Sequence, residues 1–382
     1  MTQHYAPLAL YIHWPFCVAK CPYCDFNSHV RTGVDHTAWE QALLADMAHE
    51  FALTQGQRVG SIFFGGGTPS LMPPRLVGAL IDSAARHWGL MPDVEITLEA
   101  NPSSVEAARF ADLAAAGVNR VSLGVQALED EALHRLGRVH DVAEALAALG
   151  VAQANFARVN IDLIYARPGQ SVEAWRAELE RALALGTEHL SLYQLTIEPG
   201  TRFATEVAMG RLHPLDADAA ADQFELTRAM TAAAGLPAYE VSNHAQPGAE
   251  SHHNLAYWRY QDYLGIGPGA HGRRGGVATL RLKKPENWLS AVARHGHGLV
   301  EETLLEPRDR AREALIMGLR LREGVDVARI AARTGLRAAD IIDDAGVAQI
   351  EAQGLLRRAA DHLIVTEAGM LLLDSILREA VR

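Results

Sequence analysis

Short apolar runs alternate with longer amphipathic stretches from residue 8 to about residue 245. The apolar runs are residues 8–13, 61–65, 94–99, 120–125, 158–165 and 189–195. They are rich in aliphatic and β-branched side chains, which is typical of strands covered on both faces. The amphipathic stretches between and after them predict helices at 37–53, 74–88, 105–116, 142–149, 172–185 and 217–234. This alternation predicts repeated βα units around a parallel sheet.

Six such units fit either an open doubly wound sheet or a partial barrel. Nearly every predicted strand ends in polar or glycine residues, namely His13, Gly65–Gly67, Glu99 with Asn101, Gln126, Asp162 and Gln194. In a barrel these ends converge on one mouth, where polar side chains build a site. Polar turn residues close any strand, but this explains one or two of the six more readily than all of them. The pattern therefore favours an α/β fold with a partial, TIM-like (β/α)6 barrel at residues 1–245.

The pattern changes after residue 245. Residues 246–305 are loop-rich, contain H-N-L-A-Y-W at 253–258 and a glycine loop at 265–272, and predict a linking region. Residues 306–382 predict helices near 308–322, 325–333, 338–353 and 367–380, with two short strands before the last helix. Helices followed by a small hairpin resemble a winged helix. We therefore expect a helical, winged-helix-like C-terminal domain.

Composition narrows the classes of partner and compartment. The formal net charge of -11 offers no basic face to nucleic acid, so the C-terminal domain is better interpreted as a cap or a partner surface. No run approaches the ~18 consecutive apolar residues of a membrane span, which leaves peripheral membrane contact open. The first ten residues lack the basic segment and apolar run of a signal peptide. These features predict a cytoplasmic protein.

All three cysteines lie within C-V-A-K-C-P-Y-C at 17–24, directly after the first predicted strand. Free thiols are expected in a reducing compartment, and thiolates bind soft metals. Zinc would need a fourth ligand, such as His13 or His29, because structural zinc is almost always four-coordinate. A [4Fe–4S] cluster could use three cysteines and leave one iron open. The C-x3-C-x2-C spacing favours the open cluster, with zinc as the alternative.

Two glycine loops are candidate ligand contacts. G-G-G-T-P-S at 65–70 follows the second predicted strand, where glycines let the backbone approach a ligand; without Gly-Lys-Ser/Thr it is not a phosphate loop. G-P-G-A-H-G at 267–272 matches G-x-G-x-x-G by letter only. A basic, strand-like segment follows it instead of a helix and an acidic residue. The second loop therefore predicts a close-packed turn near the mouth.

C-x3-C-x2-C after a first strand, with Tyr23 before the third cysteine, resembles the radical SAM superfamily. The resemblance implies a [4Fe–4S] cluster on Cys17, Cys21 and Cys24. Its open iron would bind the amino and carboxylate groups of S-adenosyl-L-methionine (SAM), and its reduction would allow cleavage to a 5′-deoxyadenosyl radical. Gly66, Gly67 and Thr68 match the loop that holds the amino group of the methionine. An electron donor such as flavodoxin or ferredoxin is implied as a partner.

Further segments resemble the coproporphyrinogen dehydrogenase group of that superfamily, which includes the oxygen-independent enzyme of haem synthesis and the HemW-type haem chaperones. The segments are L-Y-I-H-W-P-F at 10–16, L-E-A-N-P at 98–102, S-L-G-V-Q at 122–126, L-G-R-V-H at 136–140 and N-I-D-L-I-Y at 160–165. Carried over by motif, the residues that contact SAM are Tyr11, Tyr23, Glu99, Gln126, Arg138 and Asp162. Singly, each could be an ordinary strand-end cap or surface ion pair; as a set in matching contexts they favour a site. No catalytic residue is assigned.

Three departures separate this chain from the decarboxylating enzymes. Phe26 stands where those enzymes have a further cysteine, the segment before the first strand is short, and H-N-L-A-Y-W replaces an Arg-Asn-Phe-Gln-Gly-Tyr stretch. His-Asn-x-x-Tyr is the pattern associated with haem binding in HemW-type proteins. The resemblance thus implies haem bound by His253, Asn254 and Tyr257, with His253 as axial ligand. His244, His252 and His271 are weaker candidates for that ligand.

The predicted function is therefore a haem chaperone of the HemW type that delivers haem to acceptor proteins. The alternative is an oxygen-independent coproporphyrinogen III dehydrogenase, an oxidative decarboxylase. A third hypothesis is a zinc-bound barrel without radical chemistry. The sequence leaves open whether the protein acts as an enzyme.

Overall fold

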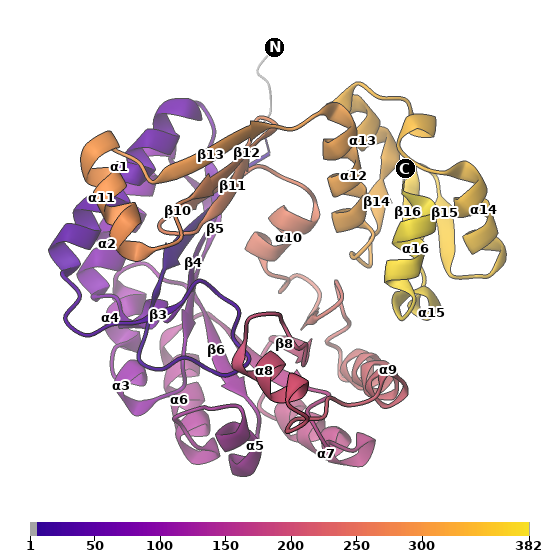
Figure 1. The fold of residues 1–382 in the computed structure, drawn as a ribbon, viewed down its shortest axis with the longest axis horizontal. Coiled ribbons are helices and arrows are strands. Elements are labelled where there is room, and N and C mark those ends of the chain that lie inside the picture. Colours follow the sequence, from indigo (N-terminus) through magenta and orange to yellow (C-terminus); the bar gives the residue numbers. More distant parts are fainter. Residues whose placement is uncertain (1–5, 382) are drawn as a thin grey trace.

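The computed structural model describes residues 6–381 (Figure 1). The first five residues, which entered the signal-peptide argument, lie outside the described part. The six predicted strands are present as β1 (Leu8–Trp14), β4 (Val59–Gly66), β5 (Leu90–Ala100), β6 (Arg120–Gln126), β7 (Arg158–Tyr165) and β8 (His189–Gln194). Each pairs in parallel with the next, so the α/β fold with a partial barrel is confirmed.

Helices cover the outer face of this sheet, and shorter helical segments such as the 3-10 turn η1 (Pro69–Leu71) and α8 (Arg202–Ala208) lie at its mouth (Figure 1). The other helices are α1 (His36–Leu53), α2 (Pro74–Trp88), α3 (Ser104–Ala107), α4 (Phe110–Ala115), α5 (Asp130–Arg135), α6 (Val142–Asn155), α7 (Val172–Leu183) and α9 (Ala217–Ala233). Side-chain caps fix several of their starts, for example Asp141, which forms a capping box with Glu144. The helix predicted at 105–116 is two helices, and the one predicted at 142–149 continues to Asn155. Leu43 of α1, Leu80 of α2 and Trp175 of α7 are fully buried in the core.

The sheet continues beyond the barrel strands on both sides. β10 (Tyr263–Ile266) pairs in parallel with β1, and β11 (His271–Arg274), β12 (Val277–Arg281) and β13 (Leu299–Leu304) follow in antiparallel order. β9 (Asn243–Ala245) pairs antiparallel with β8 at the other edge. Part of residues 246–305 therefore belongs to the same eleven-stranded sheet as the barrel. Domain boundaries at 245 and 305 stay a prediction.

A buried ion-pair cluster fastens this extension to the barrel. The Arg281 guanidinium on β12 lies 2.6 Å from Asp46 and 2.9 Å from Glu50, both on α1, and all three side chains are at most 1% exposed. Asp46 also accepts the backbone N–H groups of Gly267 and Gly298, at 3.1 Å each. Removing one partner would leave an uncompensated buried charge. The cluster therefore fixes the second glycine loop against α1.

The C-terminal part is helical, with a small sheet. It contains α12 (Pro307–Gly318), β14 (Val325–Asp326), α13 (Val327–Thr334), the 3-10 turn η2 (Ala338–Asp340), α14 (Asp344–Ala352), β15 (Leu356–Ala359), β16 (His362–Val365), α15 (Glu367–Met370) and α16 (Leu373–Ala380). The predicted hairpin is β15–β16, and β14 adds a third, unpredicted strand beside β16. α11 (Pro285–His295) lies between β12 and β13 in the chain, and the short strands β2 (Phe16–Cys17) and β3 (His29–Val30) pair in parallel. No helix within residues 6–381 is long and apolar enough to cross a membrane.

Candidate cofactor site in the barrel

A cavity of about 570 Å³ opens at the carboxyl ends of the parallel strands. Most of the predicted site residues line it: Cys17, Cys21, Tyr23, Cys24, Gly66, Gly67, Thr68, Glu99, Gln126, Arg138, Asp162 and Asn254. Tyr11, His253 and Tyr257 are not among its lining residues. The strand ends predicted to converge do so, and the cysteine loop forms part of the same wall.

The three cysteines suit a cluster held from one side. Cys17 ends β2, and the backbone N–H of Cys24 donates to the Cys21 carbonyl at 3.2 Å, which turns the loop back. Burial raises the pKa of the Cys17 and Cys24 thiols, and hydrogen bonds to each thiol act in the opposite direction. Three thiols on one cavity wall, in a chain with no fourth cysteine, fit a [4Fe–4S] cluster with an open iron.

His13 is committed elsewhere, which weakens the zinc alternative. The Tyr11 hydroxyl lies 2.9 Å from His13 Nδ1, and His13 Nε2 lies 2.9 Å from the Asn27 carbonyl oxygen. Burial lowers the pKa of His13 to about 4, so the ring is neutral, with Nδ1 accepting and Nε2 donating. Neither nitrogen is free for zinc. Within the described residues, no three His, Cys, Asp or Glu side chains are placed to hold a single metal ion.

The first glycine loop lies against the first strand and the cysteine loop. The N–H of Gly67 donates to the Trp14 carbonyl at 2.7 Å, and that of Thr68 donates to the Phe16 carbonyl at 2.8 Å. A Cβ on Gly67 would lie 2.6 Å from the Phe16 oxygen, and Gly66 has a φ of +112° with the His13 ring equally close. Only glycine fits at these two positions. The backbone is thereby exposed beside the cysteines, as expected for a loop that holds a ligand's amino group.

Two carboxylates face the cavity from neighbouring parts of the sheet. Burial, and then the charge of Asp162, raise the pKa of Glu99 to about 8, although the Gly66 N–H donates to Glu99 at 3.2 Å. Burial also raises the pKa of Asp162, which accepts from Asn160 at 2.7 Å and from Ser122 at 3.2 Å. Two carboxylate acceptors that line one cavity suit a cationic ligand that carries hydroxyl groups. SAM is such a ligand.

Glu99→Gln should stabilise the cofactor-free protein at alkaline pH and weaken SAM binding. Because the folded-state pKa of Glu99 lies above its unfolded value of 4.5, the native state loses stability as pH rises from about 4.5 through 8. Glutamine keeps the Gly66 hydrogen bond without that loss, so the free energy of unfolding at pH 8.5 should rise by about 3–5 kcal/mol. Urea unfolding at pH 6 and pH 8.5 measures this. Equal pH slopes for the two proteins would contradict the raised pKa.

Arg138 ties the cysteine loop to the strand ends. Its guanidinium donates to Cys21 Sγ at 3.3 Å, to Asn101 Oδ1 at 2.5 Å and to the Gly124 carbonyl at 3.0 Å. A Cβ on Gly137 would lie 2.6 Å from the Pro22 ring, so the loop before Arg138 also packs on the cysteine loop. The contact of Arg138 with SAM stays a prediction.

Gln126 has a strained backbone. Its φ is +68°, a left-handed value that costs a side-chain-bearing residue about 1 kcal/mol or more. Such strain persists where the surroundings impose it, and here it occurs at the end of β6, on the cavity wall. This supports the inclusion of Gln126 among the predicted ligand contacts.

Sequence reasoning missed two residues that organise the mouth. Glu106 is 4% exposed and accepts from the Ser70 hydroxyl and, at 2.7 Å, from the Asn101 N–H. Its signal was the S-x-x-E pattern that begins at Ser103, typical of a helix start. Asn27 donates to the carbonyls of Pro268 and Lys283, at 2.9 Å each.

The second glycine loop packs against the loop that follows the cysteines. A Cβ on Gly267 would lie 2.5 Å from the His13 oxygen, and one on Gly269 would lie 2.5 Å from the Asn27 amide. The interpretation of 267–272 as a close-packed turn near the mouth is therefore confirmed.

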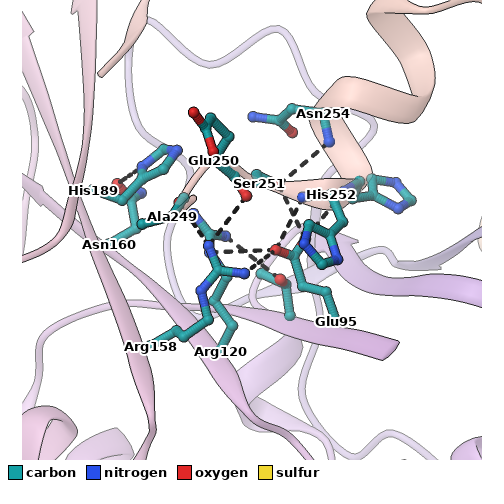
Figure 2. A network of polar contacts seen from close by, with 12 residues as sticks. Glu95, Arg120, Arg158, Asn160, His189, Ala249, Glu250, Ser251, His252 and Asn254 are labelled. Atoms are coloured by element: carbon teal, nitrogen blue, oxygen red, sulfur yellow. Dashed lines mark hydrogen bonds and ion pairs between the residues drawn. The ribbon is translucent and has the colours of Figure 1, made fainter. Parts of the chain in front are cut away.

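The H-N-L-A-Y-W segment is a helix, α10 (His252–Trp258), and not the loop expected from its polar start. Glu95 on β5 holds its beginning: the carboxylate accepts from the Ser251 hydroxyl at 3.1 Å and from the N–H groups of His252 and His253 at 3.0 and 3.1 Å (Figure 2). Arg158 lies 2.9 Å from Glu95 on its other side. Burial alone would raise the pKa of Glu95, but Arg120, Arg158 and these N–H groups hold it below its usual value.

His253 lies away from the cysteines, against the early part of β4. Its Nδ1 is 3.0 Å from the Ser61 hydroxyl, and Ser61 precedes Gly66 by five residues, about 16 Å along a strand. The ring packs on Phe63 at 4.9 Å and on Tyr257 at 5.0 Å. Burial lowers the pKa of His253 to about 3, so its imidazole is neutral.

The chemistry of the His253 imidazole suits an iron ligand, but the side chain is buried. Its Nε2 is buried and has no hydrogen-bond partner within the described residues. A buried nitrogen without a partner is unusual, and this one is available to accept a metal ion or a donor group. The residue is only 3% exposed, so haem iron reaches Nε2 only if the side chains packed around His253 move. Of the weaker candidates, His252 is exposed, His271 is exposed, and His244 is buried with Nδ1 2.9 Å from Thr231.

Comparison with known proteins accords with this geometry. A model of the radical SAM superfamily matches residues 11–182, and one of the HemN C-terminal domain matches residues 305–372. The solved structure of coproporphyrinogen III oxidase (HemN) from Escherichia coli superposes with a TM-score of 0.82 at 26% identity, over 98% of this chain and 90% of that one. The fold and the site define a radical SAM protein.

Two curated relatives narrow the group. The Escherichia coli protein named heme chaperone HemW is 42% identical over 380 residues, covering 97% of each chain. The mouse protein named radical S-adenosyl methionine domain-containing protein 1, mitochondrial, is 43% identical over 326 residues, covering 83% of this chain and 74% of the relative. The chain belongs to the group of radical SAM proteins formed by HemW and HemN. Because one relative is named mitochondrial, a cytoplasmic location stays a prediction.

Proposed function

We propose that this protein is a haem chaperone of the HemW type that delivers haem to acceptor proteins. The identity of 42% to a protein named heme chaperone HemW extends over 97% of both chains and supports this proposal. The observation that carries it is His253, a neutral imidazole with one nitrogen bonded to Ser61 and the other without a partner among the described residues. Neutral imidazole is a preferred ligand of haem iron. Asn254 and Tyr257 would lie beside the bound macrocycle.

The mouth would hold the other two cofactors. Cys17, Cys21 and Cys24 would bind the [4Fe–4S] cluster, which in radical SAM proteins supplies the electron for SAM cleavage. Gly66, Gly67 and Thr68 would orient the amino group of SAM. Glu99 and Asp162 would accept from its polar groups, with Gln126, Tyr23 and Arg138 around them, and Tyr11 would act through His13. A flavodoxin- or ferredoxin-like protein is the proposed electron donor.

His253→Ala should weaken haem binding by at least tenfold and leave the cluster intact. The substitution removes the nitrogen proposed to bind iron, while the cysteines lie at the other end of β4. Haem titration followed by optical spectroscopy, with iron and sulfide analysis of the same samples, measures both properties. His252→Ala is the matched control, because His252 is exposed and adjacent. Wild-type haem affinity in His253→Ala, or an equal loss in His252→Ala, would contradict the assignment.

Oxidative decarboxylation of coproporphyrinogen III is the second candidate. It is favoured by the TM-score of 0.82 against the HemN structure. Against it stands Phe26, which lines the cavity at 60% exposure where the decarboxylating enzymes carry a further cysteine. Mass spectrometry after anaerobic incubation of the reconstituted protein with coproporphyrinogen III, SAM and a reductant decides between the two. Loss of carbon dioxide from the tetrapyrrole would favour the enzyme, and an unchanged substrate together with saturable haem binding would favour the chaperone.

A further inference from the structure

A chain of buried hydrogen bonds joins the cavity to α10. It begins at Asp162, which accepts from Asn160 Nδ2 at 2.7 Å, and continues from Asn160 Oδ1 to His189 Nδ1 at 2.6 Å. His189 Nε2 lies 3.0 Å from the Tyr239 hydroxyl, and that hydroxyl lies 3.3 Å from Asn254 Nδ2. Asp162 is a predicted SAM contact, and Asn254, which also lines the cavity, belongs to the proposed haem helix. The chain therefore connects the two candidate sites.

The donors and acceptors of this chain run in one direction. Asn254 donates to Tyr239, Tyr239 donates to His189 Nε2, and His189 Nδ1–H donates to the Asn160 oxygen. The amide of Asn160 then donates to Asp162. Burial holds the pKa of His189 well below 6.5, so the ring is neutral and carries the single proton that this pattern needs. Bonds aligned in one sense polarise one another, so a change at one end is felt at the other.

The middle of this hydrogen-bond chain is shielded from solvent, so water does not screen a change in polarisation along it. Asn160 and His189 are 1% exposed, and Tyr239 is 5% exposed. Figure 2 shows Asn160 beside His189 and Asn254 at the start of α10. Neither His189 nor Tyr239 lines the cavity, so neither is placed to touch SAM itself. Their positions fit a linking role between two sites.

We propose that His189 and Tyr239 are positioning residues that couple SAM at Asp162 to the conformation of α10, a proposal that rests on the haem site proposed above. Polar hydrogens of the bound ligand would hold Asp162 as an ionised carboxylate, which accepts more strongly from Asn160. Each later bond then strengthens in turn, and Asn254 and the start of α10 become more ordered. SAM therefore favours the haem-binding form of the helix, and haem in turn tightens SAM binding by the same factor.

Hydrogen–deuterium exchange of the cluster-loaded, haem-free protein tests this coupling. Saturating SAM should slow amide exchange in the peptide that contains residues 252–258 severalfold in the wild type and should have no such effect in Tyr239→Phe. The substitution removes only the hydroxyl that joins His189 to Asn254. Tyr165→Phe is the matched control, because Tyr165 is equally buried but stacks on Trp175 of α7, outside the chain. It should behave as wild type.

Haem titration with and without SAM provides the second readout. The wild-type Kd for haem should fall about fivefold or more with SAM, and in Tyr239→Phe the two values should agree within twofold. Unchanged α10 exchange in wild type, or full coupling in Tyr239→Phe, overturns the inference even where haem binds. Coupled exchange without any haem binding overturns the chaperone proposal instead and leaves the coupling supported. If Tyr239→Phe does not fold, His189→Gln takes its place, and full coupling in that variant overturns the inference.

Discussion

Replacing Cys17, Cys21 or Cys24 by alanine should abolish the iron–sulfur cluster, with bound iron falling to background in each of the three variants. All three thiols lie on one wall of the cavity, and the chain has no other cysteine to substitute for a lost ligand. A cubane that already leaves one iron open does not survive with two protein ligands. Iron and sulfide analysis after anaerobic reconstitution, together with the optical spectrum, measures the loss.

Ser28→Ala is the control for these variants. Ser28 is buried in the same loop, and its hydroxyl lies 3.8 Å from Cys24 Sγ, but it is not a proposed ligand. It should keep nearly wild-type iron. Wild-type iron content in any of the three cysteine variants would refute the ligand assignment, and stoichiometric zinc without sulfide in the wild type would revive the zinc hypothesis.

Glu95→Gln should lower the free energy of unfolding by about 3–5 kcal/mol. The Glu95 side chain is 1% exposed and lies 2.9 Å from Arg158, with Arg120 also beside it. Glutamine cannot neutralise these guanidiniums, and its single oxygen cannot satisfy the hydroxyl and both N–H groups at the start of α10. Urea unfolding of the cofactor-free protein measures the loss, and circular dichroism confirms that the variant folds.

Glu188→Gln is the matched control, because Glu188 pairs with the same Arg158 at 2.9 Å but its side chain is 31% exposed. An exposed pair of this kind contributes at most about 1 kcal/mol. Since the pKa of Glu95 is depressed in the fold, its contribution is present above pH 4.5 and is lost as pH falls through the folded-state pKa. Glu95→Gln should lack that acid-dependent loss. Equal unfolding midpoints for the two variants would show that the Glu95 pair is not the anchor of α10.

Local signals in the sequence were enough for the barrel. The apolar run at 158–165 coincides with β7, because a strand that is buried on both faces needs apolar side chains at consecutive positions. The same holds for the mouth, since polar residues after parallel strands meet at one edge whatever the detailed packing. The sequence therefore predicts that Cys17, Glu99 and Asp162 meet at one mouth, and all three line the cavity there.

Long-range contacts account for what the sequence did not predict. α10 starts in S-H-H-N, which reads as a loop, and it is held by Glu95, which lies 156 residues earlier than Ser251. The burial of His253 follows from the same anchor, because a free loop would leave the ring in water. Strand β10 was missed for a related reason: its four residues gain their place only by pairing with β1.

The position of β1 between β4 and β10 also has a consequence for synthesis on the ribosome. Ala9 lies opposite Tyr263, so one side of the first strand made stays unpaired until more than half of the chain has been translated. An apolar strand with an open edge is a template for pairing with other chains. During that interval the backbone groups along this edge of β1 are open to pairing with another chain, so the burial of the edge depends on strand β10, which is made late.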